Sequence, residues 1–246
     1  MKNHAQSEIQ ITTVFDNYAF QAPLKTAWGY ACVVTGLDKT VLFDTGGDGA
    51  VLLANMKALN IDPSSIDYVF LSHIDGDHTD GLAHFLAVNP NVTVHLLDSF
   101  PSDFMAETRR LGANVHPVDG PEQIFETAFT TGVIGQLRSE HSLIVDLGEI
   151  AAIITGCAHP GIATIVARAR EIVDAKPFLI TGGFHLFRSS KSEINDVIAD
   201  LKGLGVKWAG PCHCTGDLGI HLFKEAFGEN FIKVGVGKTI NLSTLK

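Results

Sequence analysis

Residues 71–81 read Leu71-Ser72-His73-Ile74-Asp75-Gly76-Asp77-His78-Thr79-Asp80-Gly81 and contain five side chains that can bind a metal ion. The apolar residues 68–71 favour a β-strand that leads into this loop, and residues 82–86 favour a helix after it. A strand that ends in such a turn can aim several imidazoles and carboxylates at one point. Neither hydrophobic burial nor propensity requires so many ligand side chains in so short a segment. The pattern therefore indicates a metal site rather than a polar turn whose aspartate caps a helix.

This loop resembles the signature H-x-H-x-D-H of the metallo-β-lactamase superfamily. It reads His73-x-Asp75-x-Asp77-His78, so Asp75 stands where the family has its second histidine, whereas Gly81 fits the pattern. The resemblance implies an α/β fold, namely a four-layer αβ/βα sandwich. Because Asp75 departs from the pattern, the sequence leaves open whether this loop helps to bind two metal ions, one or none.

Three later loops share one design, in which an apolar run is followed by glycine and then by histidine. Residues 155–161 present Cys157 and His159, residues 181–186 present His185, and residues 210–216 present His213. Ends of parallel strands meet at one edge of a sheet, where sites in α/β proteins usually form, so we expect these histidines to converge. Together the three motifs resemble a branch of the superfamily that includes the archaeal dihydropterin–ribofuranosylaminobenzene phosphate synthases and many proteins described only as metal-dependent hydrolases.

The resemblance also implies a set of metal ligands. The set is His73, Asp75, Asp77, His78, His159 and His213. The first metal would take His73, Asp75 and a later histidine, for which we favour His159 over the alternative His141. The second metal would take Asp77, His78 and His213.

Two further residues, Cys157 and Asp44, are expected at the site in addition to this ligand set. Cys157 occupies the place of the aspartate that bridges two metals in the family, so it is either a soft ligand or a buried thiol that narrows the site. Asp44, at the end of the apolar run 41–43, is implied to brace the metal loop by hydrogen bonds.

A metal among these ligands would activate water as hydroxide, and the family's common reaction is hydrolysis of an ester, amide or phosphodiester. We expect Asp77 to orient the nucleophile and His185 to contact substrate or act as a general acid. Mixed nitrogen and oxygen ligands suit Zn, which we favour, and also Mn or Fe. The alternatives are a pterin-type synthase that forms a carbon–carbon bond, a di-iron redox protein, and a metal-poor binding protein that kept the fold.

The composition limits the remaining possibilities. The chain has 246 residues and a formal net charge of −9, which fits one domain, with an insertion near residues 99–136 that would cover the site. The negative charge disfavours nucleic acid as a partner, and no apolar run reaches the length of a membrane span, so we expect a small-molecule substrate. Residues 1–6 lead into no signal-peptide pattern and the four cysteines suggest no disulfide framework, so the cytoplasm is the expected location. The sequence does not determine the oligomeric state.

The coarse pattern alternates strands and helices. Strands are predicted at residues 9–15, 30–35, 40–44, 68–71, 92–97, 142–146, 151–155, 178–181 and 206–209, and helices near 49–59, 79–88, 162–175 and 192–204. The segment 99–136 looks irregular. Ordinary packing or surface roles are expected for the other histidines, which are His4, His84, His95, His116 and His221.

Overall fold

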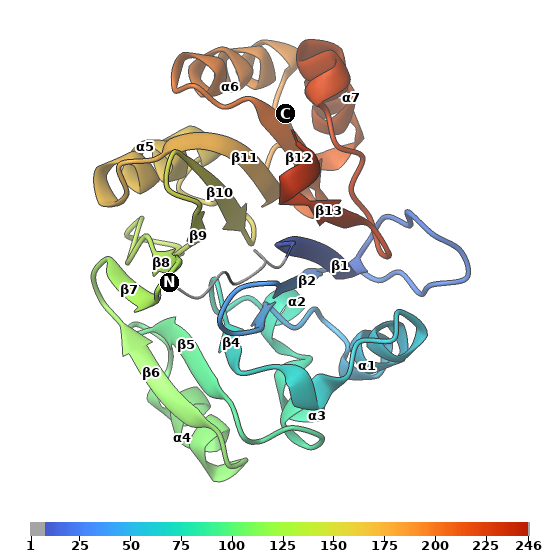
Figure 1. The fold of residues 1–246 in the computed structure, drawn as a ribbon, viewed down its shortest axis with the longest axis vertical. Helices are drawn as coiled ribbons and strands as arrows, with labels where there is room; N and C mark the ends of the chain where they lie inside the picture. Colours follow the sequence, from blue (N-terminus) through green and yellow to red (C-terminus); the bar gives the residue numbers. More distant parts are fainter. Residues whose placement is uncertain (1–7, 246) are drawn as a thin grey trace, which may run out of the picture.

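Two β-sheets pack face to face in the computed structural model, which describes residues 8–245 (Figure 1). The first sheet has the strand order β13-β1-β2-β3-β4-β5-β6, and the second has the order β12-β11-β10-β9-β8-β7. The first comprises β1 (Gln10–Asp16), β2 (Tyr30–Thr35), β3 (Val41–Phe43), β4 (Tyr68–Phe70), β5 (Thr93–Leu97), β6 (Asn114–Val118) and β13 (Thr239–Asn241). The second comprises β7 (Glu122–Phe125), β8 (Ala128–Thr130), β9 (Leu143–Asp146), β10 (Ile150–Thr155), β11 (Lys176–Gly183) and β12 (Trp208–Cys212).

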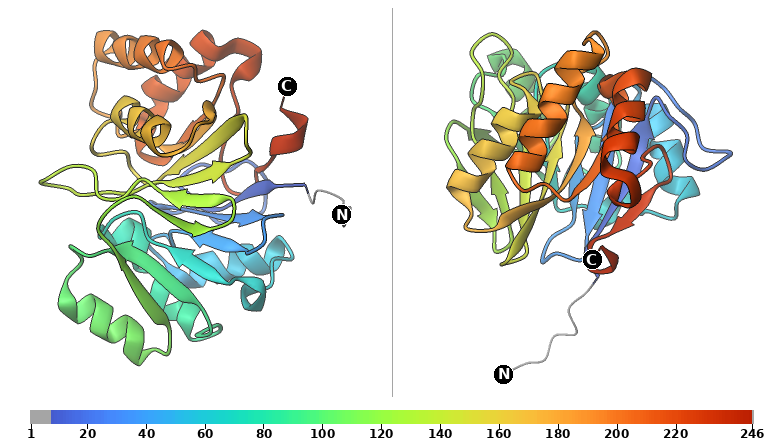
Figure 2. Two further views of the ribbon diagram at one scale, coloured as in Figure 1. Left: turned by 60° about the vertical axis from the view of Figure 1, so that its left-hand side comes forward. Right: turned by 90° about the horizontal axis from the view of Figure 1, so that it is seen from above.

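Helices cover the outer face of each sheet, which confirms the predicted αβ/βα sandwich (Figure 2). The helices beside the first sheet are α1 (Gly49–Ala58), α2 (Gly76–Thr79), α3 (Leu82–Leu86) and α4 (Ser102–Arg110). Those beside the second are α5 (Ile162–Ile172), α6 (Lys191–Gly203) and α7 (Gly216–Phe227). Among residues 8–245, none of the helices has the length and apolar character needed to cross a membrane. His4 and the N-terminal residues that lack a signal-peptide pattern lie outside the described part of the chain.

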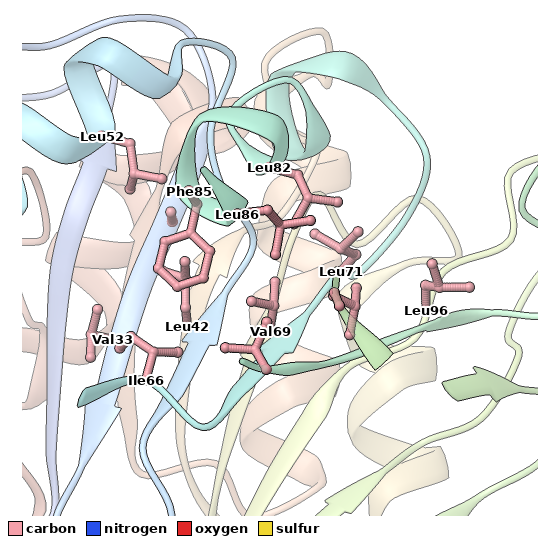
Figure 3. Close-up of a cluster of buried hydrophobic side chains, with 14 of the residues drawn as sticks. Val33, Leu42, Leu52, Ile66, Val69, Leu71, Leu82, Phe85, Leu86 and Leu96 are labelled. Atoms are coloured by element: carbon pink, nitrogen blue, oxygen red, sulfur yellow. The ribbon is translucent and has the colours of Figure 1, made fainter. Parts of the chain in front are cut away.

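Apolar packing joins each helical layer to its sheet. In α3, Leu82, Phe85 and Leu86 recur at the spacing of one helical face and pack on Leu42 and Val69 of the first sheet (Figure 3). A separate core fills the space between the two sheets and includes the stacked rings of Phe43 and Phe70. Phe85 is fully buried, so Phe85→Ala is expected to lower the free energy of unfolding by about 3–5 kcal/mol.

Strand direction explains why the ligand loops meet. Strands β3, β4, β5 and β6 run parallel to one another, as do β10, β11 and β12. Their carboxyl ends therefore face one edge of the sandwich, and the loops that follow β3, β4, β10, β11 and β12 carry the predicted site residues. This arrangement was expected from the strand-then-ligand pattern.

The structure is more regular between residues 99 and 136 than the sequence indicated. This segment contains α4 and the strands β6, β7 and β8. β6 was not predicted because it contains Pro117, and proline usually argues against a strand. β6 is the edge strand of its sheet, where proline is tolerated. The single helix predicted near 79–88 is two short helices. Gly81 lies between them against the backbone of Thr45, where there is no room for a Cβ atom.

Candidate metal centre

Five loops bring the predicted residues together at the edge between the two sheets. Asp44 follows β3, and the loop after β4 carries His73, Asp75, Asp77 and His78. Cys157 and His159 follow β10, His185 follows β11, and His213 follows β12. Asp44, His185 and His213 adopt positive φ angles of 54°, 52° and 48°, a backbone conformation that is uncommon for residues other than glycine. Such strained turns are typical of functional loops, because they aim a side chain that a relaxed strand end would not.

Two histidines of the β4 loop are anchored through Nδ1. His78 Nδ1 lies 2.7 Å from Asp44 Oδ2, and both side chains are fully buried. Asp44 also accepts hydrogen bonds from Ser72 N at 2.7 Å and Ser72 Oγ at 2.8 Å. Since the Ser72 hydroxyl donates to Asp44, it can accept from His73 Nδ1, which lies 2.9 Å away. Asp44 therefore lies beneath the loop and fixes both imidazoles.

The histidines from the second sheet are anchored in the same way. His159 Nδ1 lies 3.2 Å from Glu140 Oε2, and His213 Nδ1 lies 2.8 Å from Asn17 Oδ1. In all four rings the anchored atom is Nδ1, which leaves Nε2 directed at the space between the loops. Partners of this kind fix the tautomer and orientation of histidines that bind metal ions.

One group of ligand atoms gathers around Asp77. Asp77 Oδ2 lies 3.3 Å from His213 Nε2 and 3.6 Å from His78 Nε2. Cys157 Sγ lies 3.3 Å from His78 Nε2 and 3.5 Å from His213 Nε2. One ligand atom from each of these four residues lies within 4.8 Å of the others.

A second group shares Cys157 and adds His73 and His159, again with ligand atoms within 4.8 Å of one another. Asp75 lies at its margin, with Oδ2 at 3.6 Å from His73 Nε2 and 3.8 Å from His159 Nε2. Arg138 Nη1 also reaches this point, at 3.3 Å from Asp75 Oδ2 and 3.1 Å from His159 Nε2. The Arg138 guanidinium thus lies next to two of the predicted metal ligands, Asp75 and His159.

His141, the alternative ligand, lies outside both groups. Its Nε2 is 2.7 Å from the carbonyl oxygen of Leu71 and its Nδ1 is 2.9 Å from Thr130 Oγ1. Its ring stacks on Phe70 with 4.1 Å between the centroids. Burial lowers the pKa of His141 to about 3, so the ring is neutral and both nitrogens are committed to structural hydrogen bonds.

His185 lies next to the two groups and beside another thiol. Cys157, His185 and Cys214 form a third set of ligand atoms within 4.8 Å of one another. The backbone N–H of His185 donates to Cys214 Sγ at 3.3 Å, and the His185 ring lies 4.4 Å from that of His159, measured between centroids. Burial opposes ionisation of Cys214, but hydrogen bonds from Cys157 and His185 outweigh it and lower the pKa of the Cys214 thiol.

Charges at the centre are strongly coupled. Burial disfavours the charged form of His73, yet the carboxylates of Asp75, Glu140 and Asp44 outweigh it and raise the pKa of His73 to about 9. Burial also disfavours the Asp77 carboxylate, but His213, His78 and His73 hold its pKa well below the usual range. The carboxylates therefore favour the protonated form of His73 when no metal ion is bound.

The donor set fits a divalent transition metal. His73 Nε2 is buried and has no hydrogen-bond partner among the described residues, although a buried polar atom is normally paired. Imidazole nitrogens, carboxylates and one thiol form a mixed set that suits Zn and also accommodates Fe or Mn. A bound dication would satisfy His73 Nε2 and offset the negative charge of Asp77.

Sequence reasoning missed several contributors to the site. Glu140, fully buried, accepts hydrogen bonds from the backbone N–H groups of Cys157, Ala158 and His159. Asn17 and Arg138 approach from loops in which the sequence offered no ligand pattern. Only the position of Glu140 next to His141 could have drawn attention to it, because an isolated carboxylate carries no spacing signal.

Comparisons with known proteins identify the family and the fold. The family model described as "Metallo-beta-lactamase superfamily" matches residues 29–167. A 7,8-dihydropterin-6-methyl-4-(β-D-ribofuranosyl)-aminobenzene-5′-phosphate synthase from Methanocaldococcus jannaschii is 29% identical, over 94% of this chain and 96% of its own length. A crystal structure described as a metal-dependent hydrolase of the β-lactamase superfamily superposes with a TM-score of 0.79 at 26% identity, covering 95% of this chain and 99% of that one.

A more distant structure shares the fold. Human tRNase Z, short form, superposes with a TM-score of 0.66 at 14% identity, covering 95% of this chain and 99% of its own.

Proposed function

The chain belongs to the metallo-β-lactamase superfamily, and from this membership we propose that it is a metal-dependent hydrolase that cleaves an ester, amide or phosphodiester bond of a small molecule. The observation that carries the proposal is the convergence of four histidines, each anchored at Nδ1 and each directing Nε2 at a shared space. The solved structure described as a metal-dependent hydrolase, which is 26% identical, supports the same reaction class.

We assign the ligands in two groups that share Cys157. One consists of His73, His159 and Cys157, with Asp75 at its margin, and the other consists of Asp77, His78, His213 and Cys157. A divalent metal bound there would polarise a carbonyl or phosphoryl oxygen and lower the pKa of a water molecule. We favour Zn, with one or two ions.

Two residues of the chain are proposed to act on the reacting atoms. Asp77, whose carboxylate is held ionised by the surrounding histidines, accepts a hydrogen bond from the attacking water and orients it. His185 has a partly exposed ring beside His159 and lies outside both ligand groups, so it is free to donate a proton to the leaving group.

The rim of the site suggests the kind of substrate. Trp28 and Phe187, with 54% and 44% of their surfaces exposed, are large apolar side chains next to the ligands. The Trp28 ring lies 4.9 Å from that of His213, and Phe187 lies 5.3 Å from His185, measured between centroids. Arg138 and Arg188 add positive charge at the same rim. A small molecule with a flat apolar part and an anionic group fits this surface.

A second candidate is a pterin-type synthase that forms a carbon–carbon bond. It is favoured by one finding, the 29% identity to the archaeal synthase across nearly the whole of both chains. The same ligands and the same aromatic rim would serve such a reaction, so the two candidates differ in the bond that is made or broken.

All four cysteines are free thiols, which fits a reducing compartment, and we propose the cytoplasm as the location.

The test combines metal analysis with product analysis. Protein purified without chelator should contain one or two equivalents of Zn, Mn or Fe, and His78→Ala should lose metal while His84→Ala, an exposed helical control, should not. Hydrolysis in a panel of esters, amides and phosphodiesters that disappears with the metal would support the hydrolase. Joining of a dihydropterin to a 4-(β-D-ribofuranosyl)-aminobenzene 5′-phosphate, without hydrolysis of the panel substrates, would favour the synthase instead.

The Asp75→His variant addresses the metal-poor alternative. If the native chain binds no metal and Asp75→His gains it, the loop has lost its ligand function and the enzyme proposal fails. If the native chain and the Asp75→His variant bind the same number of metal ions, the native site binds metal with Asp75 in place, and the enzyme proposal stands.

A further inference from the structure

Three side chains with ligand atoms meet at another edge of the sandwich, and none of them belongs to the histidine cluster described above. His95 on β5 and His116 on β6 are register partners on parallel strands, so their rings lie side by side with centroids 4.7 Å apart. Glu122 begins β7 in the other sheet, and its Oε1 lies 2.6 Å from His116 Nε2. One ligand atom from each of the three lies within 4.8 Å of the others.

His95 is the unusual member of this group. Only 5% of its surface is exposed, yet neither Nδ1 nor Nε2 has a hydrogen-bond partner among the described residues. A buried polar group without a partner costs about 1–3 kcal/mol, so such groups call for an explanation. Burial, together with the nearby His116, lowers the pKa of His95 to about 4, which keeps the imidazole neutral and its lone pair available.

We propose that His95, His116 and Glu122 form a second binding site for a divalent transition metal, with Zn²⁺ as the preferred ion. Two imidazoles and one carboxylate are a donor set that Zn²⁺ accepts, with water completing a tetrahedral shell. Donors about 2.0–2.2 Å from the ion stand roughly 3.3 Å apart. The hydrogen bond between His116 and Glu122, now 2.6 Å long, therefore has to open by less than about 1 Å, and both side chains are part-exposed.

The position of the site indicates a structural role. β6 ends at Val118 and β7 begins at Glu122, so residues 119–121 carry the chain from the first sheet to the second. His116 and Glu122 lie on either side of this crossing, and His95 fixes the site to the interior of the first sheet. A metal held by all three would join the two sheets at the edge where residues 119–121 and the His116–Glu122 hydrogen bond connect them.

Counting bound zinc tests this site separately from the candidate metal centre. Metal-depleted protein is titrated with Zn²⁺ against a chromophoric chelator, and the wild type is compared with His116→Ala and Glu122→Gln. Each variant should bind one equivalent fewer than the wild type, and saturating Zn²⁺ should raise its melting temperature less. Both substitutions are at part-exposed side chains, so folding should persist.

A matched control exists on α7. His221 and Glu225 form an exposed pair with Nε2 3.3 Å from Oε1 but without a buried third histidine, so His221→Ala should bind as much zinc as the wild type. Equal zinc stoichiometry in the wild type, His116→Ala and Glu122→Gln would overturn the proposal. Because the ligands of the candidate metal centre are intact in all four proteins, neither result depends on the proposed enzymatic function.

Discussion

Glu140 holds His159 in place through a fully buried carboxylate whose Oε2 lies 3.2 Å from His159 Nδ1 and also accepts the backbone N–H of the same residue at 3.0 Å. Its other oxygen accepts the backbone N–H groups of Cys157 and Ala158. Burial opposes the charge, yet these donors and the neighbouring His159 and His73 lower the pKa of Glu140 to about 2. One carboxylate thus fixes both the shape of the turn after β10 and the ring that the turn presents.

Replacing this carboxylate should damage both stability and metal binding. In Glu140→Gln the amide N–H₂ would face backbone donors, which leaves buried groups unpaired, so we expect the free energy of unfolding to fall by about 2–4 kcal/mol. Loss of the anchor should weaken metal binding by about 10–100-fold. Chemical denaturation and competitive metal titration measure the two effects. Glu126→Gln, at an exposed position, is the control, and unchanged metal affinity in Glu140→Gln would show that the anchor is dispensable.

The role of His141 can be separated from that of a ligand. His141→Ala removes a fully buried ring and its bonds to Leu71 and Thr130, so we expect a loss of about 2–4 kcal/mol in the free energy of unfolding. The number of metal ions bound per folded chain should not change. Elemental analysis at low temperature, where the variant is folded, measures this number. A missing equivalent would make His141 a ligand after all.

The aromatic rim predicts an effect on substrate affinity. Trp28→Ala removes an exposed ring that lies against His213, so KM should rise about tenfold while kcat changes little, because aromatic contacts contribute about 0.5–1.5 kcal/mol beyond their burial. Steady-state kinetics on a substrate found in the panel measures both constants. Val88→Ala, an exposed apolar residue just after α3, should leave both unchanged. A fall in kcat at constant KM would instead place Trp28 among the residues that support the reacting atoms.

Asp16 predicts a dependence of stability on pH. Burial raises the pKa of Asp16 from its ordinary 3.8 to about 6, although the Tyr18 N–H and Cys212 oppose the shift. The folded state therefore binds the proton more tightly, and this group destabilises the fold as pH rises from about 4 to 6. Above pH 6, Asp16→Asn should raise the free energy of unfolding of metal-depleted protein by up to about 3 kcal/mol. Near pH 4, where Asp16 is largely protonated in the folded state and partly protonated in the unfolded state, the same substitution should raise it by much less. Denaturation at pH 4 and pH 7.5, with exposed Asp38→Asn as control, checks this difference.

Much of the architecture could be predicted because its signals are local. The strand before His73, several helices and the glycine–histidine turns all lie within short windows, and the sandwich architecture was expected because the loop motifs resemble those of the family. β6 and β7 were missed because edge strands are short and tolerate proline, so their sequences lack clear alternation.

The site was predictable only in part, for a related reason. Ligands at strand ends form visible motifs, whereas Glu140, Asn17 and Arg138 reach the site through contacts between distant segments. Asn17 and His213, for example, are 196 positions apart in sequence. His95 and His116 were expected to have ordinary packing or surface roles because nothing in the sequence shows that β5 and β6 are neighbours in register.

The hydrogen bonds that fix Nδ1 of the four histidines at the candidate metal centre have a consequence for how the protein would acquire metal in a cell. Rings that are already fixed by Asp44, Ser72, Glu140 and Asn17 do not need an ion to organise them, unlike small zinc domains that are unfolded without metal. Synthesis and folding of this chain would then be complete before any ion arrives. On the proposed function, the supply of exchangeable metal, rather than the folding yield, would set the fraction of molecules that are active.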